Sequence, residues 1–138
     1  MKLRYFAVLP VMFLMGCETD VQVNRVSTSD PRVQTLLEWP VPEYYANLRV
    51  ARRIADQCPR YSFDRRLDSN IAEQRSGTGR GPLAAAGQRG AIDLEFGVKR
   101  RSFEAIHQVD LDSSNLCAAG DDERARNTPL SVLLVPTG

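Results

Sequence analysis

The fold is decided by residues 42–58, PEYYANLRVARRIADQC. Apolar side chains recur there at steps of 4, 3, 4 and 3 residues, which places them on one face of an α-helix. These residues are Tyr44, Leu48, Ala51, Ala55 and Cys58. Pro59 follows at once, and because proline cannot continue a helix, the helix must end near Cys58. The stretch therefore predicts a first helix with a thiol at the end of its buried face.

Weaker helical patterns follow this first helix. Ser62 is suited to cap a second helix, which would fray near Ser76. Its inner face would hold Phe63, Leu67, Asn70 and Ile71. The next residues, Gly77–Pro82 (GTGRGP), lack the GK[ST] ending and the preceding apolar strand of a phosphate-binding loop. We therefore expect a flexible loop there.

The last third of the chain predicts more short helices. Two helical pieces fit residues 83–86 and 91–98, and a helix fits residues 99–109. A final helix over residues 115–126 places Leu116 and Cys117 inward, and Gly120 permits close packing. Thr128 can cap a last turn that begins at Pro129. The prediction is an all-α domain over residues 42–138, a small bundle of about four to five short helices.

The first residues have the order of a secretory signal. Lys2 and Arg4 precede an uncharged apolar run of 11 residues, which is too short for the roughly 20 that a membrane helix needs. Leu14-Met15-Gly16-Cys17 then resembles the lipobox of bacterial lipoproteins, which implies a diacylglyceryl group on the cysteine thiol. We expect residues 1–16 to be a lipoprotein signal peptide and Cys17 to be lipidated. The alternative is an ordinary cleaved signal peptide with a chance cysteine.

Residues 17–41 have no helical period. They are polar, with isolated valines and a break at Asp30-Pro31. The prediction is a flexible tether after the lipidated cysteine, spanning roughly 25 Å on average, with a weak alternative of a short strand over residues 21–26.

The remaining two cysteines, Cys58 and Cys117, predict a disulfide. In an exported chain such a pair persists in the oxidised form. Closing the loop between these two cysteines stabilises the fold by roughly 4 kcal/mol. A redox or metal pair is the alternative, but the chain has no CxxC motif and a single histidine. We expect no metal and no cofactor.

Charge argues against a nucleic-acid partner. Loss of residues 1–16 removes Lys2 and Arg4, which leaves 16 basic and 17 acidic residues and a net charge of −1. The arginine pairs 52–53, 65–66 and 100–101 are scattered, so we interpret them as solvated helix faces rather than as a phosphate site.

Two further candidate sites involve His107 and a group of aspartates. His107 could act as a general base, but no nucleophile with a matching acid can be placed beside it, so a surface or helix-capping role is favoured. Asp110, Asp112 and Asp121 suggest calcium ligands. The EF-hand pattern fails, however, because Asn115 replaces its glycine and Asp121 its glutamate. A helix cap at Asp112 or the following serines is the better explanation.

The chain also resembles a family of small exported two-cysteine helical proteins of alphaproteobacteria, a domain of unknown function. The matching segments are Cys58-Pro59, Leu116-Cys117-Ala118-Ala119-Gly120-x-x-Glu123 and Thr128-Pro129-Leu130-x-x-Leu133-Leu134. The resemblance covers roughly residues 43–134 and implies an all-helical disulfide domain with no known activity. Gly77–Pro82 departs from it, because relatives tend to continue a helix there.

These observations predict an envelope lipoprotein that is not an enzyme. Its membrane contact would be the lipid on Cys17, its location the periplasmic side of the cell envelope, and its partner another envelope protein. The alternative is a small-ligand-binding protein or enzyme with a pocket between helices. Electron transfer is a weaker third reading, since the chain has no CxxCH haem site and no iron–sulfur spacing.

Overall fold

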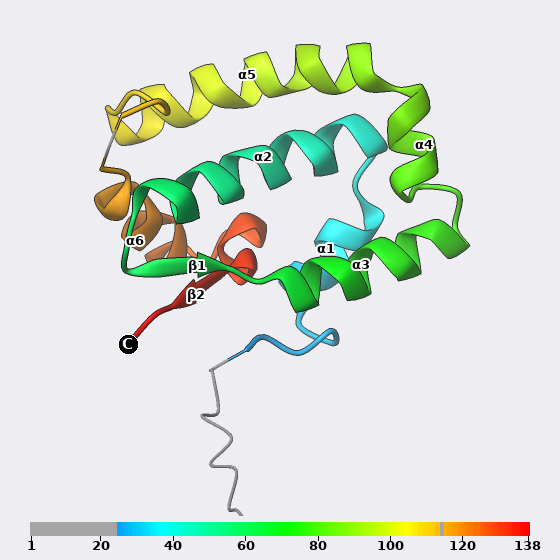
Figure 1. Ribbon diagram of the computed structural model, residues 1–138, viewed down its shortest axis with the longest axis horizontal. Coiled ribbons are helices and arrows are strands. Elements are labelled where there is room, and N and C mark those ends of the chain that lie inside the picture. The colour runs from blue at the N-terminus through cyan, green and yellow to red at the C-terminus, as the bar shows by residue number, and fades with distance from the viewer. Residues whose placement is uncertain (1–24, 114) are drawn as a thin grey trace, which may run out of the picture.

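The computed structural model describes residues 25–113 and 115–138. The predicted signal peptide, Cys17 and residues 18–24 lie outside the described residues, as does most of the strand considered for residues 21–26. Figure 1 shows a mostly helical fold, as the sequence predicts. The elements in chain order are α1 (Pro31–Glu38), α2 (Val41–Gln57), β1 (Tyr61–Phe63), α3 (Arg65–Gly77), α4 (Pro82–Gly87), α5 (Arg89–His107), α6 (Cys117–Ala125), the 3₁₀ helix η1 (Pro129–Leu133) and β2 (Leu134–Pro136).

Helix α2 forms the centre of the core. It packs along α5 on one side, while β1 and η1 contact it elsewhere and α3 lies on the far side from α5 (Figure 1). Its buried face holds Tyr44, Leu48, Ala51 and Ile54. The predicted apolar face included Ala55. The structure instead buries the larger Ile54 and leaves Ala55 half-buried, because both positions border the same face. No helix of residues 25–113 and 115–138 combines the length and the apolar character of a membrane span.

The tether prediction for residues 17–41 is wrong from residue 31 onward. Residues 31–38 form α1, with Asp30 as its N-cap and Pro31 in its first turn. Val33 and Leu36 are fully buried in the main core. Contacts with η1 and α3 hold this short helix in place, so the folded domain begins before residue 42.

A two-stranded antiparallel sheet replaces the predicted start of the second helix. Tyr61 pairs with Pro136 and Phe63 with Leu134. Ser62 therefore lies in β1, and the cap of α3 is Asp64, whose Oδ1 accepts a hydrogen bond from the Leu67 amide at 3.0 Å. This sheet brings the C-terminal segment back to the middle of the chain.

The glycine-rich middle is more regular than the sequence predicts. Residues 89–107 form one helix, α5, which continues through Gly90, because packing on α2 offsets the helix penalty of glycine. Gly77–Pro82 begins as an ordered helix end and not as a flexible loop. The Arg80 and Gly79 amides donate to the carbonyls of Arg75 and Ser76, and Gly79 has a φ of 71°. This is a Schellman motif.

Two C-terminal predictions are confirmed. Pro129 opens a short helix, η1, and the leucines of this segment are buried, although the Thr128 side chain contacts Glu123 and makes no capping hydrogen bond. Gly120 permits close packing of α6, because a Cβ atom there would lie 2.8 Å from the Tyr61 ring and 2.9 Å from Ile54 Cγ2.

Candidate functional site

The predicted disulfide joins Cys58, at the end of α2, to Cys117, at the start of α6. The two Cα atoms lie 4.9 Å apart, within the range that a disulfide requires. The bridge closes a loop with a sequence separation of 59 residues. It ties α6 to the core helix, which is a structural role.

His107 is not the surface or cap residue that the sequence favours. Its side chain is only 3% exposed and lies between two carboxylates of α6. Nδ1 is 3.2 Å from Asp122 Oδ2, and Nε2 is 2.8 Å from Glu123 Oε1. Its ring also packs on Phe103, one turn earlier in α5. The histidine therefore fastens the C-terminal end of α5 to α6.

The polar groups around His107 satisfy one another. The Thr128 hydroxyl donates a hydrogen bond to Glu123 Oε2, while the other oxygen of that carboxylate faces the imidazole. A carboxylate only accepts hydrogen bonds, so Nε2 must carry a proton when it pairs with Glu123. The Thr128 hydroxyl thus contacts the carboxylate of Glu123 and not the imidazole of His107. In a base-activated hydroxyl nucleophile the hydroxyl would contact the imidazole.

A small groove borders this cluster. It has a volume of 190 Å³ and lies between α2, α5, α6 and η1. Phe103, Glu123 and Thr128 are among the residues that line it. Lys99, which also lines it, lies 3.2 Å from Glu43 and 5.7 Å from the centre of the Trp39 ring. Acidic, basic and aromatic groups thus meet in one hollow.

The three aspartates considered as calcium ligands are engaged elsewhere. Arg100 pairs with both Asp110 (3.3 Å) and Asp112 (2.9 Å). Asp121 instead pairs with Arg60 (2.7 Å) and accepts a hydrogen bond from the Tyr61 hydroxyl. Among residues 25–113 and 115–138, no group of three or more potential metal ligands comes together.

Arg75 is a buried residue that the sequence analysis missed. It is 1% exposed, and its Nη1 donates to the carbonyls of Leu36, Leu37 and Trp39 at the end of α1. Arg80 donates to the Glu38 carbonyl of the same helix end. Burial lowers the pKa of Arg75. One sequence signal existed, since Leu67, Ile71 and Arg75 step by four along the inner face of α3.

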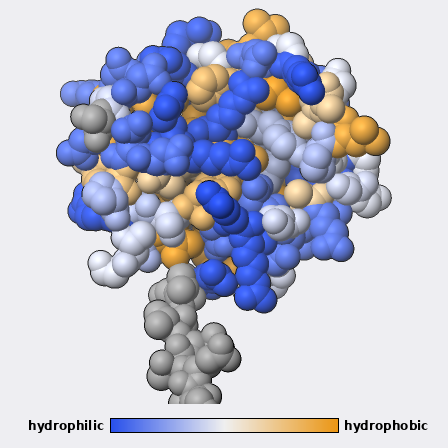
Figure 2. All heavy atoms as spheres, in the orientation of Figure 1, coloured by the Kyte–Doolittle hydropathy of each residue, from blue (hydrophilic) through white to orange (hydrophobic). Residues whose placement is uncertain are grey.

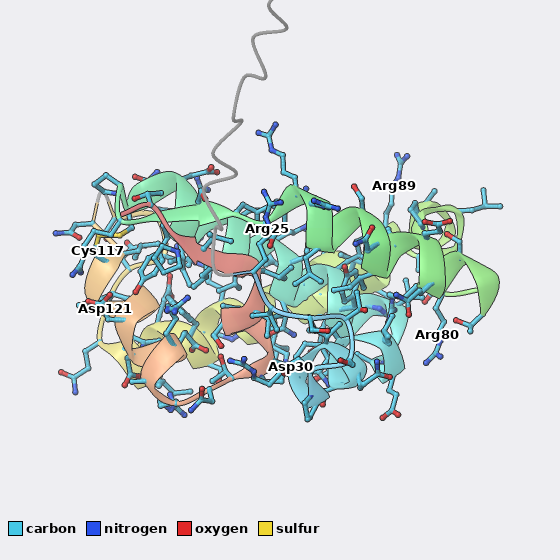
Figure 3. All side chains as sticks on the ribbon, turned by 90° about the horizontal axis from the view of Figure 1, so that it is seen from below. Arg25, Asp30, Arg80, Arg89, Cys117 and Asp121 are labelled. Atoms are coloured by element: carbon cyan, nitrogen blue, oxygen red, sulfur yellow. A yellow bond between two sulfur atoms is a disulfide. The ribbon has the colours of Figure 1, made fainter. Side chains whose placement is uncertain are left out.

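Five arginines gather on the face where the N-terminal segment joins the domain. Arg25, Arg32 and Arg124 line a hollow of 310 Å³, and Arg25 also lines a second hollow of 330 Å³ with Arg65 and Arg66. We call these five residues the arginine face. Figure 3 views the molecule from this side, with Arg25 close to the point where the described chain begins.

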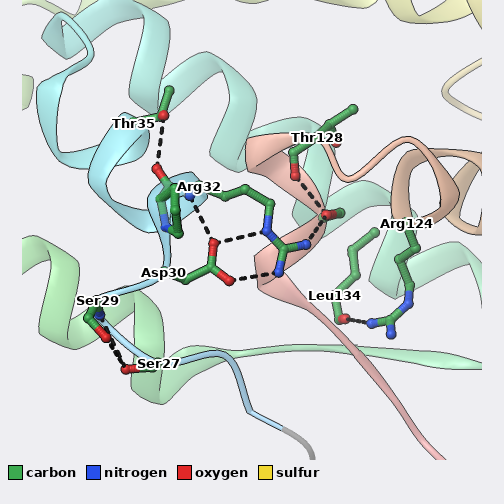
Figure 4. A network of polar contacts seen from close by, with 10 residues as sticks. Ser27, Ser29, Asp30, Arg32, Thr35, Arg124, Thr128 and Leu134 are labelled. Carbon is green, nitrogen blue, oxygen red and sulfur yellow. Dashed lines mark hydrogen bonds and ion pairs between the residues drawn. The ribbon is translucent and has the colours of Figure 1, made fainter.

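Salt bridges and hydrogen bonds hold three of these guanidinium groups, and Figure 4 shows two of them, those of Arg32 and Arg124. Arg32 pairs with both oxygens of Asp30, at 3.0 and 2.9 Å, and reaches the Ser131 hydroxyl at 3.3 Å. This hydrogen bonding lowers the pKa of Asp30 and raises that of Arg32. Arg124 donates to the Leu134 carbonyl at 2.8 Å, and Arg25 lies 3.9 Å from Asp64 Oδ2.

Exposed apolar residues lie on α4 and α5. Leu83 of α4 is 89% exposed, and Leu94 and Val98 of α5 are 77% and 50% exposed. Leu94 and Val98 are one helical turn apart, so they form part of one stripe. We call Leu94 and Val98 the outer apolar face. Figure 2 shows apolar atoms at the edges of the molecule near α5 and α4.

Comparison of the chain with family models, with curated proteins and with solved structures gives no match. The resemblance to exported two-cysteine proteins therefore stays a prediction. The helical fold and the Cys58–Cys117 bridge are observed independently of it.

Proposed function

We propose that the protein is a membrane-anchored envelope lipoprotein with a non-catalytic role, in which the helical domain holds another envelope protein. The leader and the sequence Leu14-Met15-Gly16-Cys17 support the anchor. Lipid on Cys17 would attach the domain to a membrane on its periplasmic side. Arg25 follows Cys17 by only eight residues in the sequence, so the domain would stay close to that membrane.

The outer apolar face is the observation that carries the partner-binding role. Single exposed apolar residues are ordinary, but Leu94 and Val98 share one helical stripe and are at least half exposed. Helix α5 is the element farthest from the incoming N-terminal segment in Figure 1. An anchored domain would therefore present this stripe away from the membrane, where a second envelope protein can reach it.

The anchor is tested on the mature N-terminus. Mass spectrometry should find an acylated cysteine at position 17, and Cys17→Ala should leave the domain folded but release it from membranes. An intact leader, or cleavage elsewhere with an unmodified cysteine, would refute the anchor.

The partner role is tested by site-specific photocrosslinking in intact cells. A photoreactive residue at position 94 should give a discrete adduct with one envelope protein, and the same residue at position 70 should not. Asn70 is a matched control because it is also exposed but lies on α3. Val98→Glu should abolish the adduct without lowering the protein level. Equal crosslinking from both positions would contradict the proposal.

The second candidate is a small-ligand-binding protein or enzyme that uses the groove beside Glu123. The groove supports it because Lys99 and Glu123 place opposite charges near an aromatic wall. Lys99→Gln is a suitable test, because this side chain is partly exposed and its replacement leaves the core intact. Loss of cellular function in Lys99→Gln at a normal protein level, with the position-94 adduct retained, would favour this candidate.

A further inference from the structure

We propose that the arginine face binds the phosphate groups of an anionic membrane surface. The inference rests on the proposed lipid anchor and extends it: the lipid would attach the chain, while the arginines would orient the domain. The first support is local charge. The two hollows are lined by five arginines and two aspartates, Asp30 and Asp64, although the chain from residue 17 onward has a net charge of −1.

The second support is the way the guanidinium groups are held. The Leu134 carbonyl orients Arg124 through one hydrogen bond from Nη1, so this side chain does not have to lose all its freedom upon binding, whereas Nε and Nη2 of Arg32 are already paired with Asp30. Guanidinium groups also match phosphate oxygens in geometry, because they offer planar pairs of donors.

The third support comes from the start of α3. Arg65 and Arg66 occupy its first turn, where the helix dipole disfavours positive charge. Within the described part of the chain neither side chain forms an ion pair, and both are exposed. A phosphate group placed beside them would relieve this repulsion and would also interact favourably with the helix N-terminus.

The fourth support is the length of the chain between the anchor and this face. Eight residues reach at most roughly 28 Å when fully extended. A lipid on Cys17 would therefore keep Arg25 within about that distance of the headgroups. The arginine face adjoins the start of the described chain and so would be the side nearest the membrane (Figure 3). This position favours a lipid surface over a soluble anion as the partner.

The test uses the chain from residue 17 with Cys17→Ser, so that no acyl chain contributes. Its core and disulfide lie within the described residues, so the contacts of the fold are retained. Sedimentation with vesicles of phosphatidylcholine, with and without phosphatidylglycerol, measures binding at low salt. We expect binding only to the anionic vesicles and release at high salt, because screening shortens the range of these interactions.

The matched variants each remove two positive charges. Arg65→Gln with Arg66→Gln should lower partitioning onto anionic vesicles by about 30-fold, since each arginine near such a surface contributes roughly fivefold. Arg89→Gln with Arg101→Gln is the control. It changes two exposed arginines of α5, on the other side of α2, and should lower partitioning less than threefold. Circular dichroism verifies that both variants are folded.

Three results would overturn the inference. The first is an equal loss in both double variants, which would mean that only total charge matters. The second is no binding to anionic vesicles at low salt. The third is saturable binding of inorganic phosphate without vesicle binding, which would indicate a soluble anion instead. None of these results would contradict the proposed lipid anchor, because the anchor is tested separately by mass spectrometry of the mature N-terminus. An unmodified Cys17 would remove the anchor without changing the vesicle result.

Discussion

Replacing Arg75 by methionine removes the buried guanidinium that fastens the end of α1 to α3. The carbonyls of Leu36, Leu37 and Trp39 lose their shared donor, and Tyr44 loses a cation 4.2 Å from its ring centre. Methionine keeps most of the side-chain volume, so the experiment isolates the polar contacts from a packing defect.

The expected loss of stability follows from these contacts. One buried carbonyl left without a partner costs about 1–3 kcal/mol. The cation–π contact adds about 1–2 kcal/mol in a desolvated site. The other two carbonyls are partly exposed, so water can replace the guanidinium there. Relief of the charge burial offsets part of the total, because Arg75 Nη2 has no hydrogen-bond partner in the described structure. We expect Arg75→Met to lower the free energy of unfolding by about 3 kcal/mol.

The assay is urea unfolding of the oxidised chain from residue 17 with Cys17→Ser, followed by far-ultraviolet circular dichroism. Arg101→Met, an exposed position on α5, is the control and should change stability by less than about 0.5 kcal/mol. Hydrogen exchange should show faster opening of residues 31–38 in the Arg75 variant. A loss no larger than that of the control would refute the view that this arginine holds α1 in place.

Four further predictions concern stability. Cys58→Ala should lower the free energy of unfolding by about 2–5 kcal/mol in the same urea assay. Gly120→Ala should destabilise by about 1–3 kcal/mol in thermal unfolding, although alanine favours helices, because the new Cβ would overlap the Tyr61 ring. His107→Ala should cost about 1–3 kcal/mol in urea unfolding, because it leaves Glu123 under-paired, yet should leave cellular function unchanged at a matched protein level. Burial raises the pKa of Tyr44, so the folded state retains its proton longer; stability should fall as pH rises above about 10, and less steeply in Tyr44→Phe.

The sequence was sufficient to predict a structural feature wherever a local pattern or a covalent bond determines that feature. The stripe that starts at Tyr44 and the stop at Pro59 predicted the core helix, and the turn at Pro129 followed from the preference of proline for the first helical position. The disulfide followed from the cysteine count and the expected export of the chain. Each of these inferences needed only neighbouring residues or a chemical pairing.

Non-local pairing explains the failures. Helix α1 has only eight residues and depends on its contacts with η1 and α3, and its start signal at Asp30-Pro31 was interpreted as a break in the chain. Strand β1 forms because residues 134–136 return to it from the end of the chain. Arg75 lies one turn after Ile71 of the predicted inner face but was not predicted to be buried, because its partners are carbonyls 36–39 residues away. The arginine face likewise combines separate segments that no spacing rule connects.

The contacts of Arg75 also connect the stability of the domain to its arginine face. Arg32 belongs to α1, while Arg65 and Arg66 belong to α3. These three arginines lie at the N-terminal ends of the two helices. Near the C-terminal ends, the buried guanidinium of Arg75 and the hydrogen bond from Arg80 to the Glu38 carbonyl hold α1 and α3 together. Helices α1 and α3 also contact each other and η1, so these contacts and the buried hydrogen bonds together hold the arginines of the two helices at a constant separation. The buried arginine therefore has a structural role that extends to the proposed membrane-binding surface, although it lies outside that surface itself.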